Sequence, residues 1–192
     1  KRLVDVNKGS EYYMNGLSCP LTGLYQLKNL MTVLQACDLL PAAGINVTTD
    51  HMREGIAKVI QNTGLMGRWQ ILSQNPLTVC DTGHNEAGIR EVMRQVENTP
   101  HEHLHFVFGT VNDKDLSPIL QLLPKNASYY FCRPDIPRGL DENLLALKAN
   151  DAGLAGIAYP SVKDALNAAK DAASPEDMIL VSGSNFVVAE VL

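Results

Sequence analysis

The sequence predicts an α/β protein with a mostly parallel sheet that is covered by helices on both faces. From Arg68 onward, short apolar runs alternate with segments in which apolar residues recur at helical spacing. Polar segments that contain glycine follow several of the apolar runs. Repeated units of this length are typical of a parallel sheet with crossover helices.

The part of the chain before Arg68 lacks this alternation. In chain order we expect a strand at 1–7, a loop or hairpin at 8–23, a helix at 24–40 and a second helix from about 49. Pro41 and Gly44 end the first helix, and Thr49-Asp50 is expected to cap the second. Two helices and an isolated strand form a poor core, so we expect this segment to be the tail of a domain that lies upstream.

The remainder of the chain is predicted to alternate strands with helices. The strands are expected at 69–73, 77–81, 104–109, 127–132, 156–159 and 178–182, and the helices at 86–97, 116–123, 141–150 and around 162–169.

Composition excludes several classes of protein. The 192 residues are 45% hydrophobic and 19% charged, which is typical of a soluble globular protein. A net charge of −5 argues against nonspecific nucleic-acid binding, which needs a basic surface. The sequence contains neither an apolar run long enough to span a membrane nor a signal peptide.

The four cysteines lie far apart and form no Cys-x-x-Cys pair, so we expect reduced thiols and a cytoplasmic location. The chain begins at Lys1 rather than Met, which indicates a piece of a longer protein.

The stretch from Asp81 to Asn85 carries the most chemistry. It follows an apolar strand and precedes an amphipathic helix, and ligands of open α/β sheets bind at such strand ends. Asp81 could accept hydrogen bonds from ribose hydroxyls or a metal-bound water, and His84 could donate to a phosphate or carboxylate. The alternative is an Asp that caps the next helix and a His that is satisfied locally.

Other candidates are weaker when each is considered alone. Arg68 could bind phosphate through its guanidinium, or it could be a surface residue of a linker. Asn29 lies inside a predicted helix, where asparagine is slightly unfavourable, and could simply be exposed. The segment 182–184, Ser-Gly-Ser, could bind an anion or carboxylate, or form an ordinary loop.

Two further segments favour structural interpretations. His101, His103 and His105 alternate and could share one face, which suggests a metal, but a solvated approach to a strand explains them as well. Segment 108–115 follows a strand without the spacing of a phosphate-binding P-loop, and Asp113 could cap the next helix. We therefore predict no metal ligand and no catalytic residue within this chain.

Six short motifs, taken together and in order, resemble folylpolyglutamate synthase/dihydrofolate synthase, the folate members of the Mur ligase superfamily. The motifs are G-x-x-Q-x-x-N at 23–29, G-R-x-x-x-L at 67–72, D-G-A-H-N at 81–85, F-G-x-x-x-D-K-D at 108–115, P-R at 137–138 and T-G-S at 182–184. This sequence departs by having Thr82-Gly83 where the family has Gly-Ala, and Ser182 where it has Thr.

The resemblance implies an ATP-dependent amide ligase. A carboxylate of folate or dihydropteroate would attack the γ-phosphate of ATP, and the amine of L-glutamate would then displace phosphate from the acyl phosphate. It implies that Asn29 contacts adenine, Arg68 the phosphates and Asp81 the ribose. His84, Ser182 and Ser184 would line the glutamate pocket. The family's phosphate loop, its Mg²⁺ ligands and its folate pocket would lie upstream of this chain.

The resulting hypothesis assigns 1–67 to the tail of a central α/β ATP-binding domain and 68–192 to a Rossmann-like C-terminal domain. The chain alone is expected to lack ligase activity and to bind nucleotide weakly at most. One alternative is a Mur ligase of peptidoglycan precursor synthesis, and another is a non-catalytic nucleotide-binding module. Partners would be the small substrates and the upstream domain, with no nucleic acid and no membrane.

Overall fold

The computed structural model describes residues 2–9, 11–112 and 115–192, and it divides into two compact units. Unit 1 comprises Lys1–Arg68 and unit 2 comprises Trp69–Leu192. The division falls one position after the boundary that the sequence suggests.

Unit 1 combines a hairpin with helices around a small core. Its elements are β1 (Arg2–Lys8), β2 (Glu11–Cys19), α1 (Gln26–Leu39), a 3₁₀ turn η1 (Leu40–Ala43), α2 (Thr49–Ala57) and α3 (Val59–Thr63). The two strands pair antiparallel, so the expectation of an isolated strand was wrong. The segment 8–23 instead contributes the second strand, which buries Met14 and Leu17 against Leu30 and Leu34 of α1.

The cap of α2 lies one residue before the position expected from the sequence. The Thr48 hydroxyl accepts the backbone N–H of His51, and His51 Nδ1 accepts the backbone N–H of Thr48. This reciprocal capping box satisfies two helix-terminal donors. Thr49 is already the first helical residue, so it cannot serve as the cap.

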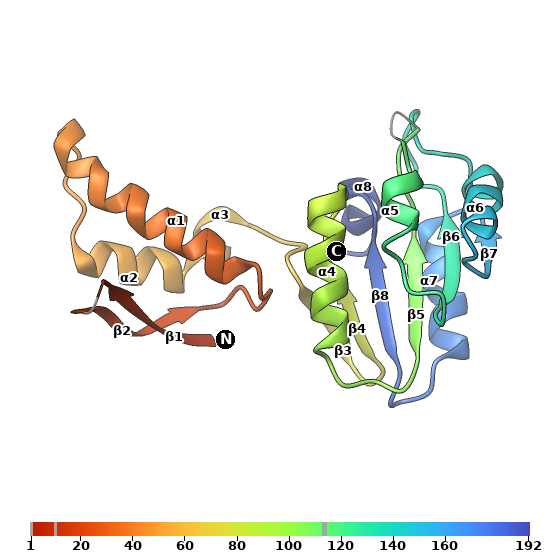
Figure 1. The fold of residues 1–192 in the computed structure, drawn as a ribbon, viewed down its shortest axis with the longest axis horizontal. Coiled ribbons are helices and arrows are strands. Elements are labelled where there is room, and N and C mark those ends of the chain that lie inside the picture. The colour runs from red at the N-terminus through yellow and green to blue at the C-terminus, as the bar shows by residue number, and fades with distance from the viewer. Residues whose placement is uncertain (1, 10, 113–114) are drawn as a thin grey trace. The chain divides into compact units, whose positions relative to one another are not determined.

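Unit 2 is built on a six-stranded sheet with the strand order β3-β4-β8-β5-β6-β7 (Figure 1). The strands are β3 (Gln70–Gln74), β4 (Leu77–Cys80), β5 (Leu104–Phe108), β6 (Ser128–Cys132), β7 (Gly156–Tyr159) and β8 (Met178–Ser182). Only the edge strand β3 runs antiparallel to its neighbour. The strands β4, β8, β5 and β6 therefore all end at the same edge of the sheet.

Helices cover both faces of this sheet, which confirms the predicted fold class. The helices are α4 (Glu86–Glu97), α5 (Ser117–Leu120), α6 (Glu142–Asp151), α7 (Val162–Ala172) and α8 (Asn185–Ala189). The first three bury residues in one core with Phe106 and Phe131, and the last two in a second core with Val107 and Val181. No helix in the described ranges is long and apolar enough to span a bilayer.

Helix α5 is shorter than the predicted 116–123. After Leu120, the N–H of Leu122 bonds to Ile119 and that of Leu123 to Leu120, which is the tighter 3₁₀ pattern. Pro124 follows directly, and a residue before proline disfavours the α conformation. The helix therefore ends early.

The four cysteines are all free thiols. Burial raises the pKa of Cys80 to about 12 and raises the pKa of Cys132 as well. Thiolate is the nucleophilic form of cysteine, so these two buried side chains are inert packing groups.

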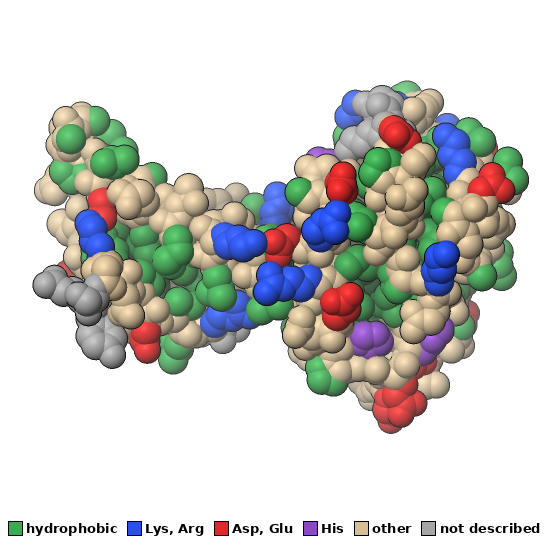
Figure 2. Space-filling view, viewed as in Figure 1, with side chains coloured by type: hydrophobic (Ala, Val, Ile, Leu, Met, Phe, Trp, Pro, Cys, Tyr) green, Lys and Arg blue, Asp and Glu red, His purple; other side chains and the backbone are tan. Residues whose placement is uncertain are grey.

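A polar network lies where β5, β6 and β8 begin, at the edge opposite their carboxyl ends. The buried His105 places Nδ1 2.9 Å from the Tyr130 hydroxyl and Nε2 3.3 Å from Asp177. His103 instead contacts Ser128, and His101 contacts the carbonyl of Thr99. Figure 2 shows histidine side chains at this lower end of unit 2.

The three histidines thus use separate hydrogen-bond partners, although the rings of His103 and His105 meet edge to face with centroids 5.0 Å apart. Among the described residues, no group of three His, Cys, Asp or Glu side chains is arranged to hold a metal ion. The network of His105, Tyr130 and Asp177 instead joins β5, β6 and the residue before β8 near the ends at which these strands begin.

Burial lowers the pKa of His105 below its ordinary value of 6.5, and the bond to Asp177 offsets only part of this effect. The folded state therefore disfavours the imidazolium, whereas the unfolded chain protonates normally. Protonation favours unfolding as pH falls below about 6.5. The pKa of Asp177 is also lowered, chiefly by the backbone N–H of Ser174. The contribution of this carboxylate to the stability of the folded state is therefore lost only at a more acidic pH.

We expect unit 2 to have a lower free energy of unfolding at about pH 5.5 than at about pH 7.5, with His105→Gln reducing this difference. The single tryptophan, Trp69, reports unfolding of unit 2 by fluorescence. His101→Gln is the matched control, because His101 lies outside the network. Equal pH dependence in the wild type and His105→Gln would contradict the assignment.

Candidate functional site

The site begins with Asp81, which directly follows β4. Its backbone N–H bonds to Val181, so this residue continues the sheet pairing one step beyond the strand. Its carboxylate accepts two backbone N–H groups, from Gly83 to Oδ1 at 2.9 Å and from Trp69 to Oδ2 at 2.7 Å. The residue is only 2% exposed. The alternative interpretation, that Asp81 caps helix α4, was wrong, because the cap of α4 is Asn85.

The residues after Asp81 divide between a polar site and a helix cap. His84 Nδ1 lies 2.9 Å from the carbonyl of Thr82. A carbonyl can only accept, so Nδ1 carries a proton and donates it to this carbonyl. Asn85 caps α4 by accepting the backbone N–H of Gly88 at 2.8 Å. Asn85 is therefore structural, whereas His84 lies in the turn itself.

The loop after β8 interlocks with the loop after β4. The fully buried Ser182 hydroxyl lies 2.6 Å from the carbonyl of Asp81 and 3.2 Å from that of Gly83, and it donates its proton to them. Gly83 in turn accepts the backbone N–H of Gly183. Ser184 is buried and caps α8 by accepting the N–H of Phe186. The two serines therefore hold the two loops in place.

Gly183 is required where the loops after β8 and β5 approach each other. Its φ of +105° is in a region that other residues rarely adopt. A Cβ at this position would also lie 2.6 Å from the carbonyl oxygen of Gly109. The Ser-Gly-Ser segment thus follows from close backbone packing at this edge.

The loops after β5 and β6 complete this edge. Thr110 accepts the N–H of Leu140, and Arg138 accepts the N–H of Asn112 through its carbonyl. The Arg138 guanidinium lies over the Phe186 ring, 5.3 Å from its centre, which is a cation–π distance. Segment 133–140 is therefore fixed against α8.

The motif at 108–115 is only partly visible. Asp113 and Lys114 lie outside the described residues, and so does the cap of the next helix that the sequence predicts for Asp113. Asp115 accepts the backbone N–H of Ser117 at the start of α5.

Arg68 directly precedes Trp69, the residue whose backbone N–H donates to the Asp81 carboxylate. Gly67 has a φ of +68° and Trp69 has a φ of +49°, so the two residues that flank Arg68 are both left-handed. The Arg68 side chain is half-buried, with Nη1 3.4 Å from the carbonyl of Gly67.

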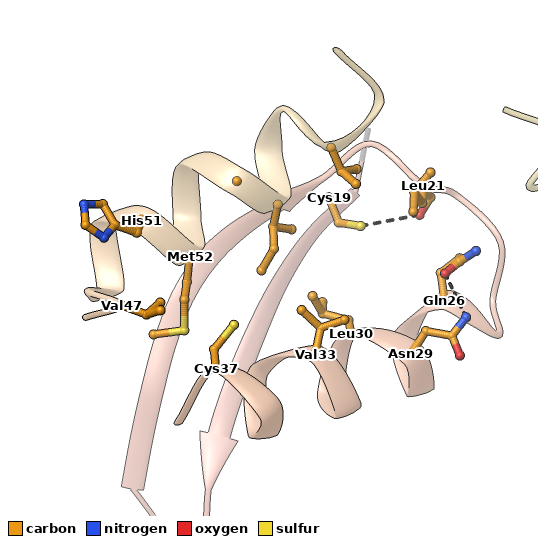
Figure 3. A pocket seen from close by; sticks show the side chains of 13 residues that line it. Cys19, Leu21, Gln26, Asn29, Leu30, Val33, Cys37, Val47, His51 and Met52 are labelled. Carbon is orange, nitrogen blue, oxygen red and sulfur yellow. Dashed lines mark hydrogen bonds between the residues drawn. The ribbon is translucent and has the colours of Figure 1, made fainter. Parts of the chain in front are cut away.

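Asn29 lies on α1 in unit 1, where it is exposed and donates to the Gln26 side chain at 3.0 Å. These two side chains lie at one end of a cavity of about 280 Å³, with His51 at the other end (Figure 3). The rest of the lining is mainly apolar and includes Cys37 and Met52. Polar side chains thus lie at both ends of the cavity, with Gln26 and Asn29 at one end and His51 at the other.

The structure brings four of the six candidate residues to one edge of unit 2, namely Asp81, His84, Ser182 and Ser184. Arg68 is covalently next to this edge, and Asn29 belongs to unit 1. Sequence reasoning missed the backbone N–H of Trp69 as a partner of Asp81, because no side-chain pattern signals a main-chain donor. Sequence reasoning singled out the dipeptide 137–138, but it did not predict that the Arg138 guanidinium lies over the Phe186 ring.

The fold and this edge define a member of the Mur ligase family. The family model described as "Mur ligase, glutamate ligase domain" matches residues 67–185, so the chain belongs to this family.

Similar proteins are named as folate enzymes. The dihydrofolate synthase/folylpolyglutamate synthase of Escherichia coli is 34% identical over 167 residues, covering 85% of this chain and 37% of that protein. A probable bifunctional folylpolyglutamate synthase/dihydropteroate synthase of Haloferax volcanii is 31% identical over 172 residues, covering 89% and 20%.

The structure described as E. coli FolC in complex with DHPP and ADP has a TM-score of 0.78 at 30% identity, covering 96% of this chain and 42% of that one. The chain therefore spans well under half the length of these relatives.

We expect Ser182→Ala to lower the free energy of unfolding of unit 2 by about 1–3 kcal/mol, because the carbonyls of Asp81 and Gly83 both lose the buried hydroxyl that donates to them. Ser174→Ala is the matched control, since Ser174 is exposed and its bond to Asp177 uses the backbone N–H, which alanine keeps. Denaturant unfolding followed by Trp69 fluorescence measures both. Equal stability of the two variants would show that the Ser182 hydroxyl contributes nothing.

Proposed function

We propose that this chain is the C-terminal part of an ATP-dependent ligase that adds L-glutamate to dihydropteroate or folate through an acyl-phosphate intermediate. The observation that carries the proposal is the edge of unit 2, where the Asp81 carboxylate accepts the backbone N–H of Trp69, the residue after Arg68, and precedes the turn that contains His84. The names of the similar proteins support the folate substrates.

Arg68, Asp81 and Asn29 are the proposed nucleotide-binding residues. Arginine is always charged and presents a fork of donors, so Arg68 would neutralise the phosphates as the phosphoryl group transfers. A carboxylate is a strong acceptor, so Asp81 would accept a hydrogen bond from a ribose hydroxyl. Because Asp81 is almost fully buried, neighbouring groups must move to admit the ribose. Asn29 would contact the adenine.

His84, Ser182 and Ser184 are the proposed glutamate-binding residues, and the geometry separates their roles. The Ser182 proton is already donated to two carbonyls, so this hydroxyl would act by holding the loop. The Ser184 oxygen accepts a backbone N–H, which leaves its proton for a carboxylate. His84, whose ring is held at Nδ1 by the carbonyl of Thr82, would contact the incoming glutamate.

Unit 1 is proposed to be the tail of the central ATP-binding domain, whose larger part would carry the phosphate loop. Mg²⁺ would neutralise the triphosphate there, with ligands from that upstream part. The partners would thus be ATP, folate or dihydropteroate, L-glutamate and the upstream domain. The free thiols fit a cytoplasmic enzyme.

Two alternatives remain distinguishable by experiment. A ligase of peptidoglycan precursor synthesis would use a muramyl substrate, which the upstream pocket selects. A non-catalytic module would bind nucleotide without turnover.

We expect the full-length protein to form ADP and phosphate only when both folate or dihydropteroate and glutamate are present. The 192-residue chain alone should show no ligation and at most weak ATP binding, because the phosphate loop is upstream. Liquid chromatography with mass spectrometry of the glutamylated product measures this. Ligation by the isolated chain, or turnover with a muramyl substrate alone, would contradict the proposal.

We expect Arg68→Ala in the full-length enzyme to reduce kcat by on the order of a hundredfold, because a charge on the transferring phosphoryl group is lost. Arg90→Ala is the matched control, since Arg90 is exposed on α4 and pairs with Glu86. Steady-state kinetics with saturating substrates measures both. An unchanged kcat in Arg68→Ala would remove Arg68 from the site.

A further inference from the structure

We propose that Asp81 is a positioning residue for Arg68, which it holds in place through the backbone of Trp69. This inference deepens the proposed function, on which its kinetic test rests. It concerns what the Asp81 carboxylate does in the protein without nucleotide, namely fix the backbone at the first residue of unit 2.

The first step is the rigidity of Asp81 itself. Its backbone N–H is paired with Val181, and its carbonyl accepts the Ser182 hydroxyl at 2.6 Å. The residue is thus fixed on both sides of its backbone to the neighbouring strand β8. Its buried carboxylate is therefore held at one position, where it accepts the N–H groups of Gly83 and Trp69.

The second step is the strained backbone of Trp69. A φ of +49° is unusual for a bulky residue and persists only where the surroundings determine it. Two contacts do so here. The indole is 5% exposed and packs in the core with Val79 and Ile89, and the backbone N–H donates to Asp81 at 2.7 Å.

The third step connects this anchor to Arg68. The N–H that Asp81 holds belongs to the peptide bond that joins Arg68 to Trp69, so the plane of this peptide is set by the carboxylate. The guanidinium extends from the next Cα along a long, flexible side chain. Its reach depends on the direction of that Cα–Cβ bond, and small misplacements of a catalytic group reduce rate strongly.

Two simpler interpretations of Asp81 predict different effects when its carboxylate is removed. If Asp81 only stabilises its own turn, the important bond is the one to Gly83. If it only binds ribose, its removal affects ATP affinity and depends on the ribose hydroxyls. An anchor affects the Trp69 amide without any nucleotide, and affects turnover with any nucleoside triphosphate.

The first test uses the 192-residue chain and amide hydrogen exchange followed by NMR. In the wild type, we expect the Trp69 amide to be protected at a level close to that of Val107 in the buried strand β5. A Trp69 amide that exchanges as fast as an exposed loop amide would overturn the proposal, with no variant needed.

Asp81→Ala sharpens this test, because alanine removes both acceptor oxygens, the one for Trp69 and the one for Gly83. We expect exchange at Trp69 to accelerate by about tenfold or more, with the Val107 amide as the control for global unfolding. Acceleration confined to Gly83 would favour the turn interpretation and contradict the anchor.

The second test uses the full-length enzyme with ATP and with 2′,3′-dideoxy-ATP, which lacks the ribose hydroxyls. We expect Asp81→Ala to lower kcat by a similar factor with both nucleotides. A defect confined to KM for ATP, and absent with the dideoxy analogue, would assign Asp81 to ribose binding alone.

A double variant completes the test. If Asp81 acts through Arg68, then Asp81→Ala should reduce kcat little further in an Arg68→Ala background. Fully multiplicative effects would overturn the link. If the wild-type full-length protein shows no ATP-dependent ligation, the proposed function fails, whereas the exchange results at Trp69 still decide the anchor.

Discussion

The buried Asp81 carboxylate is the constraint on which the candidate site depends. Removing a carboxylate from water is costly unless hydrogen bonds replace the lost hydration. Here the chain itself supplies two N–H donors, one from the turn that follows and one from the residue at which unit 2 begins. Charge-assisted bonds of this kind are stronger than neutral ones. A single side chain thus fixes the turn to Gly83 and the first residue of unit 2.

Residues at the end of β8 also stabilise this edge of the sheet. Ser182 donates to the carbonyls of the Asp81 turn, and Gly183 lets the backbone approach Gly109 more closely than any side chain would permit. The loops that follow β4, β8 and β5 are therefore held by one another as well as by the sheet. Binding residues placed on such mutually supported loops keep their geometry without a ligand.

The sequence predicted most of the sheet because its strands are apolar runs that are buried on both faces, such as 104–108 and 178–182. It failed where a different physical effect decides the outcome. Strand β2 has Asn15, Gly16 and Ser18 among its apolar residues, which resembles a loop in the sequence, and it pairs with β1 in the structure. At the site, the residue types were predictable from their motifs. The partner of Asp81 was not, because Trp69 contributes a main-chain N–H that any residue except proline carries.

The two edges of the sheet in unit 2 use different kinds of interaction. The edge where the strands begin is joined by side chains, with His105 between Tyr130 and Asp177. The edge that carries Asp81 is joined mainly by backbone N–H and carbonyl groups, with the Asp81 carboxylate and the Ser182 hydroxyl as their partners. Strand β5, with five residues, separates the two edges by about 16 Å, a distance at which a Coulomb interaction is about a quarter of its strength at 4 Å. Protonation of His105 should therefore act mainly on its own partners, Tyr130 and Asp177, and only weakly on Asp81.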